Sequence, residues 1–319
     1  MITPPAAADT VTLAQISDVH LGPLPPVPLW LASPKRLAGA ANWARQRRFT
    51  HLPALAEAWA ADLAAAHADH TAVTGDLCNV GLPAEVERGR AYLGRLGPPD
   101  RVSVIPGNHD IYGRVMGRRL GISALQPWAP YFAANAAGAE YTDTAAFPFV
   151  RILTRGSTSV ALIGLNSAVE TPPIIATGWL GADQLQRLAR VLDATARDGH
   201  VRVVMLHHPP LPGLADAQHA LTDASALAAV LQTHGAELVI HGHNHRAMFN
   251  QAAGPQGPVP VIGVPSASAG RALGGENLAR AHLFQIAGRA ASAHITLIAR
   301  GLASPGGAIV EIERRVLVG

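Results

Sequence analysis

Cysteine, lysine and long apolar runs are almost absent from this chain of 319 residues. Cys78 is its one cysteine, which excludes an internal disulfide and a cysteine-based metal cluster. No apolar run approaches the roughly 20 residues of a membrane-spanning helix. Residues 1–10 lack the basic region and apolar run of a signal peptide. We therefore expect a cytoplasmic protein.

Charged residues are also few. They make up 15% of the chain, against 49% hydrophobic residues, which favours a large core and argues against global disorder. The formal net charge is only +3, so overall charge does not indicate nucleic-acid binding, and we expect no nucleic-acid partner. The length allows one large domain or two small ones.

The chain does contain polar residues placed at the ends of expected strands. The segment 104–110 (VIPGNHD) begins as a buried strand, which a Pro-Gly pair terminates, and Asn108, His109 and Asp110 follow at once. Ligands of open α/β sheets bind beyond the carboxyl ends of strands. There an amide can offer an oxygen to a metal, and an imidazole can offer a proton to a leaving group. By itself, the segment is equally compatible with a polar turn.

Similar clusters follow four other expected strands. Asp18 and His20 come after the strand 11–17, and their i, i+2 spacing places two side chains on one face of a strand. Asp76 follows a second strand, and histidine runs follow two later ones. The candidate metal ligands are therefore Asp18, His20, Asp76, Asn108, His207, His243 and His245, with His208 as an alternative to His207.

These seven side chains offer carboxylate, imidazole and amide groups but no thiolate. Such a mixture suits Mn, Fe, Co or Zn better than Ca. Seven ligands are too many for one ion and suit two ions that share a carboxylate. Two ions ~3.5–4 Å apart can clamp a phosphoryl group and lower the pKa of a bridging water. The expected cofactor is thus a pair of divalent or trivalent transition-metal ions.

The order and spacing of these clusters resemble the calcineurin-like metallophosphoesterase superfamily. Its pattern is D-x-H, G-D, G-N-H-D, a lone H and G-H-x-H, which is matched here at positions 18–20, 75–76, 107–110, 207 and 242–245. The resemblance covers about residues 11–250 and is closest to the cyclic-nucleotide phosphodiesterase-like branch.

The resemblance implies a role for each residue. One metal would be held by Asp18, His20 and His245, the other by Asn108, His207 and His243, and Asp76 would bridge both. His109 would protonate the leaving oxygen or stabilise the transition state, while a metal-bridging hydroxide attacks phosphorus in line. Asp110 would orient His109, as a carboxylate behind an imidazole does.

The fold of this superfamily is a four-layer α/β/β/α sandwich of two mixed sheets. Strand–helix alternation in the first half of the chain and a strand-rich second half agree with it. We expect one domain over residues 1–319, with a basic inserted cap element at about 30–50. A helix over about 34–49 would have Ser33 as its N-cap and proline at its first position.

This insert combines tryptophans with five cations, Lys35, Arg36, Arg45, Arg47 and Arg48. One hypothesis is a solvated surface helix. The other is a basic lid for an anionic ligand or a membrane surface, which would make the protein peripheral at a membrane. In that case Arg45 and Arg48 or their neighbours would bind anionic substrate, and Asn108 would also contact it.

The first functional hypothesis is a dinuclear-metal phosphohydrolase, most simply a phosphodiesterase with a small-molecule phosphoester substrate. The alternative is a pyrophosphatase acting on a nucleotide-linked lipid precursor, similar to the UDP-diacylglucosamine hydrolases of this superfamily, and the basic insert motivates it. A third hypothesis is a scaffold that kept the fold and lost catalysis. The complete ligand set and His109 argue against that scaffold.

Overall fold

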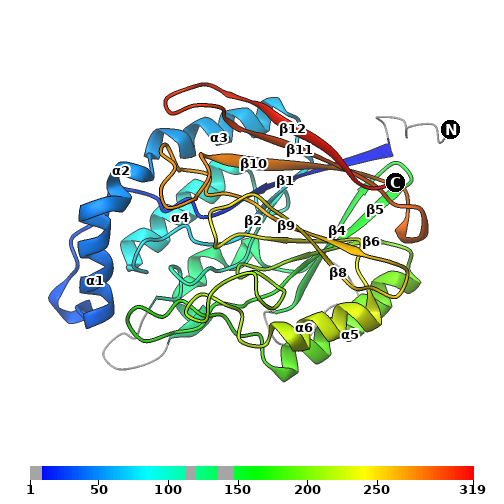
Figure 1. Cartoon of the computed structure of the whole chain (residues 1–319), viewed down its shortest axis with the longest axis horizontal. Coiled ribbons are helices and arrows are strands. Elements are labelled where there is room, and N and C mark those ends of the chain that lie inside the picture. The colour runs from blue at the N-terminus through cyan, green and yellow to red at the C-terminus, as the bar shows by residue number, and fades with distance from the viewer. Residues whose placement is uncertain (1–8, 113–119, 136–146) are drawn as a thin grey trace.

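Twelve strands, most of them largely buried, form two six-stranded mixed sheets in the computed structural model, which describes residues 9–112, 120–135 and 147–319 (Figure 1). The first sheet has the strand order β12-β11-β10-β1-β2-β3, and the second has the order β4-β5-β6-β7-β9-β8. Strand β1 contacts β4 and β5, and β10 contacts β5, so the sheets pack face to face.

In the first sheet, β1 to β3 run parallel and β10 to β12 add an antiparallel extension. The strands are β1 (Thr10–Ile16), β2 (His70–Val73), β3 (Val102–Val104), β10 (Arg280–Ala287), β11 (His294–Leu302) and β12 (Ile309–Val318). Parallel strands place their carboxyl ends at one edge of a sheet. The segments that follow β1, β2 and β3 are therefore neighbours.

In the second sheet, β5, β6, β7 and β9 run parallel, flanked by antiparallel β4 and β8. The strands are β4 (Phe149–Arg155), β5 (Thr158–Gly164), β6 (Val201–Met205), β7 (Leu238–His241), β8 (Met248–Ala252) and β9 (Val259–Gly263). Strands β5, β6, β7 and β9 are almost wholly buried, as expected for parallel strands covered on both faces.

Helices cover the outer faces. Helices α3 (Pro53–Ala65) and α4 (Pro83–Leu96) contact each other along the first sheet, and α5 (Ala182–Arg197) and α6 (Ala224–His234) lie together on the opposite side, against β6 and β8 (Figure 1). Helix α5 buries a stripe of aliphatic residues at helical spacing that includes Leu188 and Leu192. In the part of the chain that the structure describes, no helix is both long and apolar enough to cross a membrane.

The insert begins with a short 3₁₀ turn (Leu29–Leu31) and continues as α1 (Pro34–Asn42), a π-helical turn (Trp43–Arg47) and α2 (Arg48–Thr50). The expected N-cap is confirmed, because the Ser33 side chain accepts a hydrogen bond from the backbone of Arg36. The π-helical turn was not predicted.

Two of the five cations of the insert attach it to the body of the protein. Arg36 is buried and donates to the carbonyls of Leu31 and Val80, and Lys35 donates to Thr171. These two side chains therefore serve packing, which leaves the three arginines of the second half for other roles.

The expected sandwich is confirmed. Strand β8 was missed, since its mixture of polar and apolar residues is mostly half-buried and shows no clear alternation. The expected helix-and-loop region 112–147 contains a 3₁₀ segment (Gly121–Tyr131), and positions 113–119 and 136–146 lie outside the described residues.

Strand β10 contains a buried histidine that should make folding sensitive to acid. His282 is fully buried, and in the described structure neither ring nitrogen has a hydrogen-bond partner. Burial, together with the nearby Arg280 cation, lowers the pKa of His282 to about 3. Below the unfolded pKa of about 6.5, the unfolded chain binds a proton here and the folded chain does not, so stability falls by roughly 1.4 kcal/mol per pH unit.

His282→Leu is expected to remove this dependence. Relative to wild type, the variant should gain about 2 kcal/mol in its free energy of unfolding between pH 7.5 and pH 5, measured by urea denaturation. Because the variant and wild type share all other titratable groups, the pH dependence of those groups cancels in the difference between the two proteins. His294→Leu, a partly exposed position on the same sheet, is the matched control. An equal difference between variant and wild type at both pH values would contradict the prediction.

Candidate functional site

The polar clusters of both sheets meet at one place between the sheets. Asp18 follows β1, Asp76 follows β2 and Asn108 follows β3, all in the first sheet, while His207 follows β6 and His243 follows β7 in the second. Because the parallel strands of each sheet end at the same edge, the loops carry these side chains into a common pocket.

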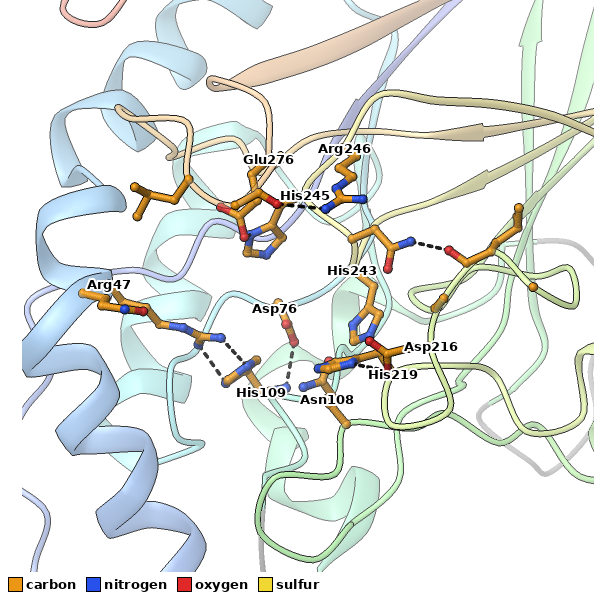
Figure 2. Close-up of a pocket in the computed structure, with 18 residues that line it drawn as sticks. Arg47, Asp76, Asn108, His109, Asp216, His219, His243, His245, Arg246 and Glu276 are labelled. Carbon is orange, nitrogen blue, oxygen red and sulfur yellow. Dashed lines mark hydrogen bonds and ion pairs between the residues drawn. The ribbon is translucent and has the colours of Figure 1, made fainter.

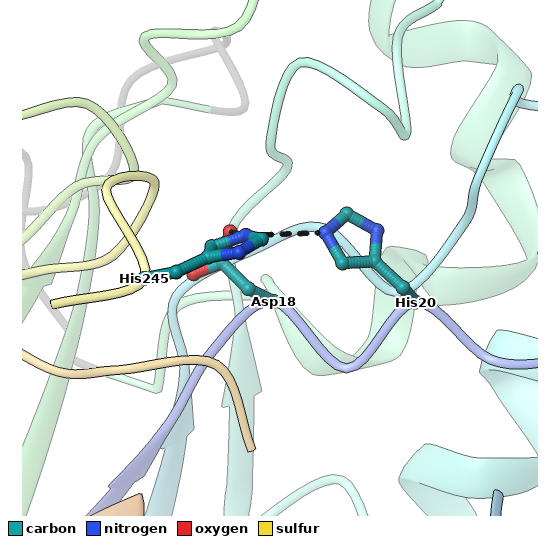
Figure 3. A group of neighbouring side chains, drawn as sticks. All are labelled: Asp18, His20 and His245. Atoms are coloured by element: carbon teal, nitrogen blue, oxygen red, sulfur yellow. Dashed lines mark hydrogen bonds and ion pairs between the residues drawn. The ribbon is translucent and has the colours of Figure 1, made fainter. Parts of the chain in front are cut away.

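One group consists of Asp18, His20 and His245, which lie within ligand distance of one another (Figure 3). The Nε2 atoms of His20 and His245 are 3.4 Å apart, and His245 Nε2 is 3.3 Å from Asp18 Oδ1. All three side chains are buried. This is the first ligand set that the resemblance implied.

A second group joins Asp18 and Asp76 to His207. His207 Nε2 lies 3.5 Å from Asp76 Oδ2, 3.1 Å from Asn108 Oδ1 and 3.2 Å from His243 Nδ1. Asp76 Oδ2 is also 3.9 Å from His20 Nε2, so this carboxylate stands between the two groups. The structure thus brings all seven candidate ligands together.

The geometric argument for Asp18 and His20 was wrong, although both residues reach the site. Strand β1 ends at Ile16, so these residues follow the strand and do not share one of its faces. Five candidate ligands have left-handed φ angles, which are costly for residues other than glycine: Asp18 (54°), His20 (44°), Asp76 (58°), His243 (73°) and His245 (53°). The loops are held in strained conformations that aim the side chains inward.

The orientation of the imidazoles fits metal binding. Nδ1 of His20 lies 3.0 Å from the Cys78 carbonyl and Nδ1 of His207 lies 2.7 Å from the Thr74 carbonyl. Each of these contacts fixes the proton on Nδ1 and turns the Nε2 lone pair toward the site. Asp18 Oδ1 is buried there and accepts no hydrogen bond in the described structure. Buried acceptors that face one another in this way fit a cation between them.

The pKa shifts of the candidate ligands also fit a cation site. Burial would raise the pKa of the Asp76 carboxyl, but His207 and His109 hold it well below its usual range. Against the effect of burial, Asp76 raises the pKa of His207 to about 9, and Asp18 raises that of His245 to about 10. A metal ion must displace the protons on these imidazoles, so its binding weakens as the pH falls.

The alternative ligand His208 points elsewhere. Its Nδ1 lies 2.8 Å from the Ser167 hydroxyl and its Nε2 lies 3.2 Å from the Ala176 carbonyl. Both ring nitrogens are therefore engaged away from the two carboxylates. The geometry favours His207.

Asp110 does not have the place that the resemblance implied. Its carboxylate accepts hydrogen bonds from the backbone amides of Asp76, Cys78 and Gly107, at 2.7, 2.9 and 2.9 Å, and so joins the loops after β2 and β3. Burial and the Asp76 carboxylate raise its pKa to about 7. The His109 imidazole is held instead by the Asn79 carbonyl, 2.5 Å from Nδ1, and by stacking on Tyr112.

The insert reaches the site through an arginine other than the two singled out from the sequence. A cavity of about 970 Å³ opens over the candidate ligands, and Gln46 and Arg47 form part of its wall (Figure 2). Arg45 and Arg48 are exposed, and the Arg48 guanidinium lies over the Phe49 ring. They are not among the residues that line this cavity. Substrate binding by these two residues stays a prediction.

Sequence reasoning also missed Glu276. Its carboxylate lies 3.2 Å from Nδ1 of His245, behind the imidazole (Figure 2). A carboxylate in this position fixes the orientation of a ligating histidine and increases its basicity. Glu276 lies in a loop after β9 that carries no recognisable motif, so the sequence held no signal for it.

Three comparisons relate the chain to known proteins. The model of the calcineurin-like phosphoesterase family matches residues 11–247. The glycerophosphodiester phosphodiesterase GpdQ of Enterobacter lignolyticus is 28% identical over 188 residues, which are 57% of this chain and 58% of that protein. This chain thus spans less than two thirds of the length of that relative.

Solved structures resemble the chain in fold. A dimetal phosphatase from Danio rerio superposes with a TM-score of 0.56 at 13% identity, covering 97% of this chain and 99% of that one. The purple acid phosphatase PPD1 from yellow lupin gives 0.53 at 11% identity, covering 97% of this chain and 54% of that one. Because the family model covers most of the chain, including every candidate ligand, the protein belongs to the calcineurin-like phosphoesterase family.

Proposed function

We propose that the protein is a phosphodiesterase that uses two transition-metal ions, Mn, Fe, Zn or Co, and that residues 1–319 act as one domain. The observation that carries the proposal is the convergence of two ligand groups around Asp76 and Asp18 at the base of a cavity of about 970 Å³. One group would hold the first ion, the other would hold the second, and Asp76 would bridge them. When bound, two ions neutralise phosphoryl charge and lower the pKa of a bound water.

Nε2 of His109 would relay a proton to the leaving group. The carbonyl of Asn79 fixes the proton of His109 on Nδ1, so Nε2 is the atom that can face a substrate. The backbone amide of His109 donates to Asp76 Oδ1 at 2.7 Å, which ties the position of the imidazole to the carboxylate between the two groups. Asn108, beside it, would contact both an ion and a phosphate oxygen. Water adds to phosphorus and releases a proton, and the P–O bond to the leaving group breaks. The leaving oxygen takes a proton from Nε2, which would first have to take one up from solvent, because a neutral ring with its proton on Nδ1 carries none there.

A panel of substrates tests the proposal. Protein loaded with Mn should hydrolyse bis-(p-nitrophenyl) phosphate, and chelation should abolish this activity. Cyclic AMP, a glycerophosphodiester and p-nitrophenyl phosphate, a monoester, then define the preferred class. The GpdQ relative is a glycerophosphodiester phosphodiesterase, which makes that arm the natural comparison. Protein that binds the metal and hydrolyses no phosphoester would refute the proposal.

A second candidate is the pyrophosphatase acting on a nucleotide-linked lipid precursor at a membrane surface. It is supported by the large apolar side chains that the insert exposes, namely Leu29, Trp30, Leu37 and Phe49. They accompany the exposed Arg45 and Arg48, and such a combination suits an anionic lipid surface. Hydrolysis of a UDP-linked acyl sugar, presented in vesicles that contain anionic lipid, distinguishes this candidate function from the phosphodiesterase. Turnover that Trp30→Ser does not change would remove this support.

A further inference from the structure

Arg47 is the one arginine of the insert that lies against a candidate catalytic group. It ends the π-helical turn, and its guanidinium extends across the pocket to His109 (Figure 2). Nη2 is 2.8 Å from Nε2 of the imidazole and Nη1 is 3.1 Å from Nδ1. A π-helical turn adds a residue to a helix and changes the direction of the side chains that follow, and such turns are frequent at functional sites.

Only one of these two contacts can be a hydrogen bond. Nδ1 of His109 lies 2.5 Å from the Asn79 carbonyl, so it carries the ring proton and donates it to that oxygen. Arginine nitrogens only donate, which leaves Nε2 as the acceptor for Arg47. The guanidinium therefore covers the ring atom through which His109 would act on a substrate.

Besides Arg47 and the Asn79 carbonyl, Tyr112 also holds the His109 ring in place. Tyr112 stacks on the imidazole with ring centroids 5.1 Å apart, and the Tyr112 hydroxyl donates to the Lys35 carbonyl of α1. A side chain at Gly39 of α1 would clash with the Tyr112 ring, so only glycine allows this close approach. The insert thus supports the Tyr112 ring on which His109 stacks, and it covers Nε2 of His109 with Arg47.

Arg47 has an incomplete set of partners. In the described part of the chain it forms no ion pair, and its hydrogen-bonding contacts are with the neutral imidazole of His109. A guanidinium has five N–H donors, and one of them, on Nη2, is used here for the bond to Nε2 of His109. Phosphate oxygens accept charge-assisted, often bidentate hydrogen bonds from arginine, which are stronger than a bond to a neutral nitrogen.

We propose that Arg47 binds a non-bridging phosphate oxygen of the substrate, and that in doing so it uncovers Nε2 of His109. This inference rests on the proposed function. Without substrate, the guanidinium stays on the imidazole. When a phosphoester enters, the guanidinium moves to the anionic oxygen, and Nε2 becomes free to take up a proton and to face the leaving oxygen. Only a ligand with phosphate charge on this side of the pocket would expose the imidazole.

Phosphate binding and steady-state kinetics test the inference. On Mn-loaded protein, Arg47→Ala should raise the Kd of inorganic phosphate, measured by calorimetry, by about tenfold to a hundredfold, the range given by hydrogen bonds to charged groups. The KM for bis-(p-nitrophenyl) phosphate should rise with it. Arg47→Lys, which keeps the charge and loses the fork, should fall between Arg47→Ala and wild type.

Controls separate this role from a structural one. The metal content and the melting temperature of the Arg47 variants should match those of wild type. If Arg47→Ala does not fold, Arg47→Gln, whose side chain is of similar length, takes its place. Arg90→Ala, on the exposed face of α4, should bind phosphate as wild type does. Unchanged Kd and KM in folded Arg47 variants would overturn the inference. So would losses confined to Arg45→Ala or Arg48→Ala.

The two proposals can fail separately. If wild type hydrolyses no phosphoester, the proposed function is refuted, while phosphate binding to the metal-loaded protein still reports on Arg47. If wild type hydrolyses phosphodiesters and the Arg47 variants bind phosphate normally, only the role of Arg47 is refuted.

Discussion

Asp76→Ala is expected to lose bound metal and activity together. Asp76 Oδ2 is the carboxylate atom that lies between the two ligand groups, 3.5 Å from His207 Nε2 and 3.9 Å from His20 Nε2. If it bridges the two ions, its removal takes a ligand from each of them. Metal catalysis contributes several kcal/mol, and each ~1.4 kcal/mol is a factor of ten, so turnover of bis-(p-nitrophenyl) phosphate should fall by about 10³-fold or more. Elemental analysis of purified protein, which should hold close to two ions in wild type, measures the metal.

A loss of folding must be separated from a loss of metal. Asp76 also accepts the His109 amide, so Asp76→Asn, which keeps the shape and lacks the charge, is the second variant. Asp193→Asn, an exposed acid on α5, is the control and should keep full metal content. Full occupancy with normal turnover in both Asp76 variants would show that this carboxylate does not bridge the ions.

His109→Ala is expected to keep its metal and to lose rate. The imidazole lies outside both ligand groups, so its removal should not change the metal content. General acids typically contribute ~10²–10⁴-fold. The loss should be large for substrates with alkoxide leaving groups and smaller for p-nitrophenolate, because a good leaving group needs little protonation. Steady-state rates on a diester of each kind measure the difference.

Two outcomes would change this assignment. An equal loss with both leaving groups would indicate that His109 stabilises charge in the transition state and does not transfer a proton. A loss of metal would make it a ligand. The tautomer leaves Nε2 for the substrate side, since Nδ1 is committed to the Asn79 carbonyl, and Nε2 must take up a proton before it can transfer one.

The convergence of the candidate ligands was predictable because it depends on topology. Asp18, Asp76 and Asn108 each follow one of three parallel strands, and such strands must end at one edge. The local geometry was not predictable in the same way. The spacing of Asp18 and His20 suggested a strand face, whereas both residues lie in a loop with left-handed φ angles that only the surrounding packing can impose.

Contacts made by residues distant in sequence could not be inferred. Asp110 follows His109 directly, yet its carboxylate turns to backbone amides, because buried amides of two loops need an acceptor. Arg47 contacts His109 from the end of a π-helical turn, an irregularity that the helical pattern of the insert did not indicate. Glu276 reaches His245 from a loop that no pattern in the sequence connects with the site.

The placement of the candidate ligands on two separate sheets has a consequence for the cohesion of the molecule. Asp18, His20, Asp76 and Asn108 belong to the first sheet, and His207, His243 and His245 belong to the second. An ion held by residues that follow strands of both sheets would therefore cross-link the two sheets of the sandwich. Metal supply would then set the strength with which the sheets hold together as well as the rate of the reaction.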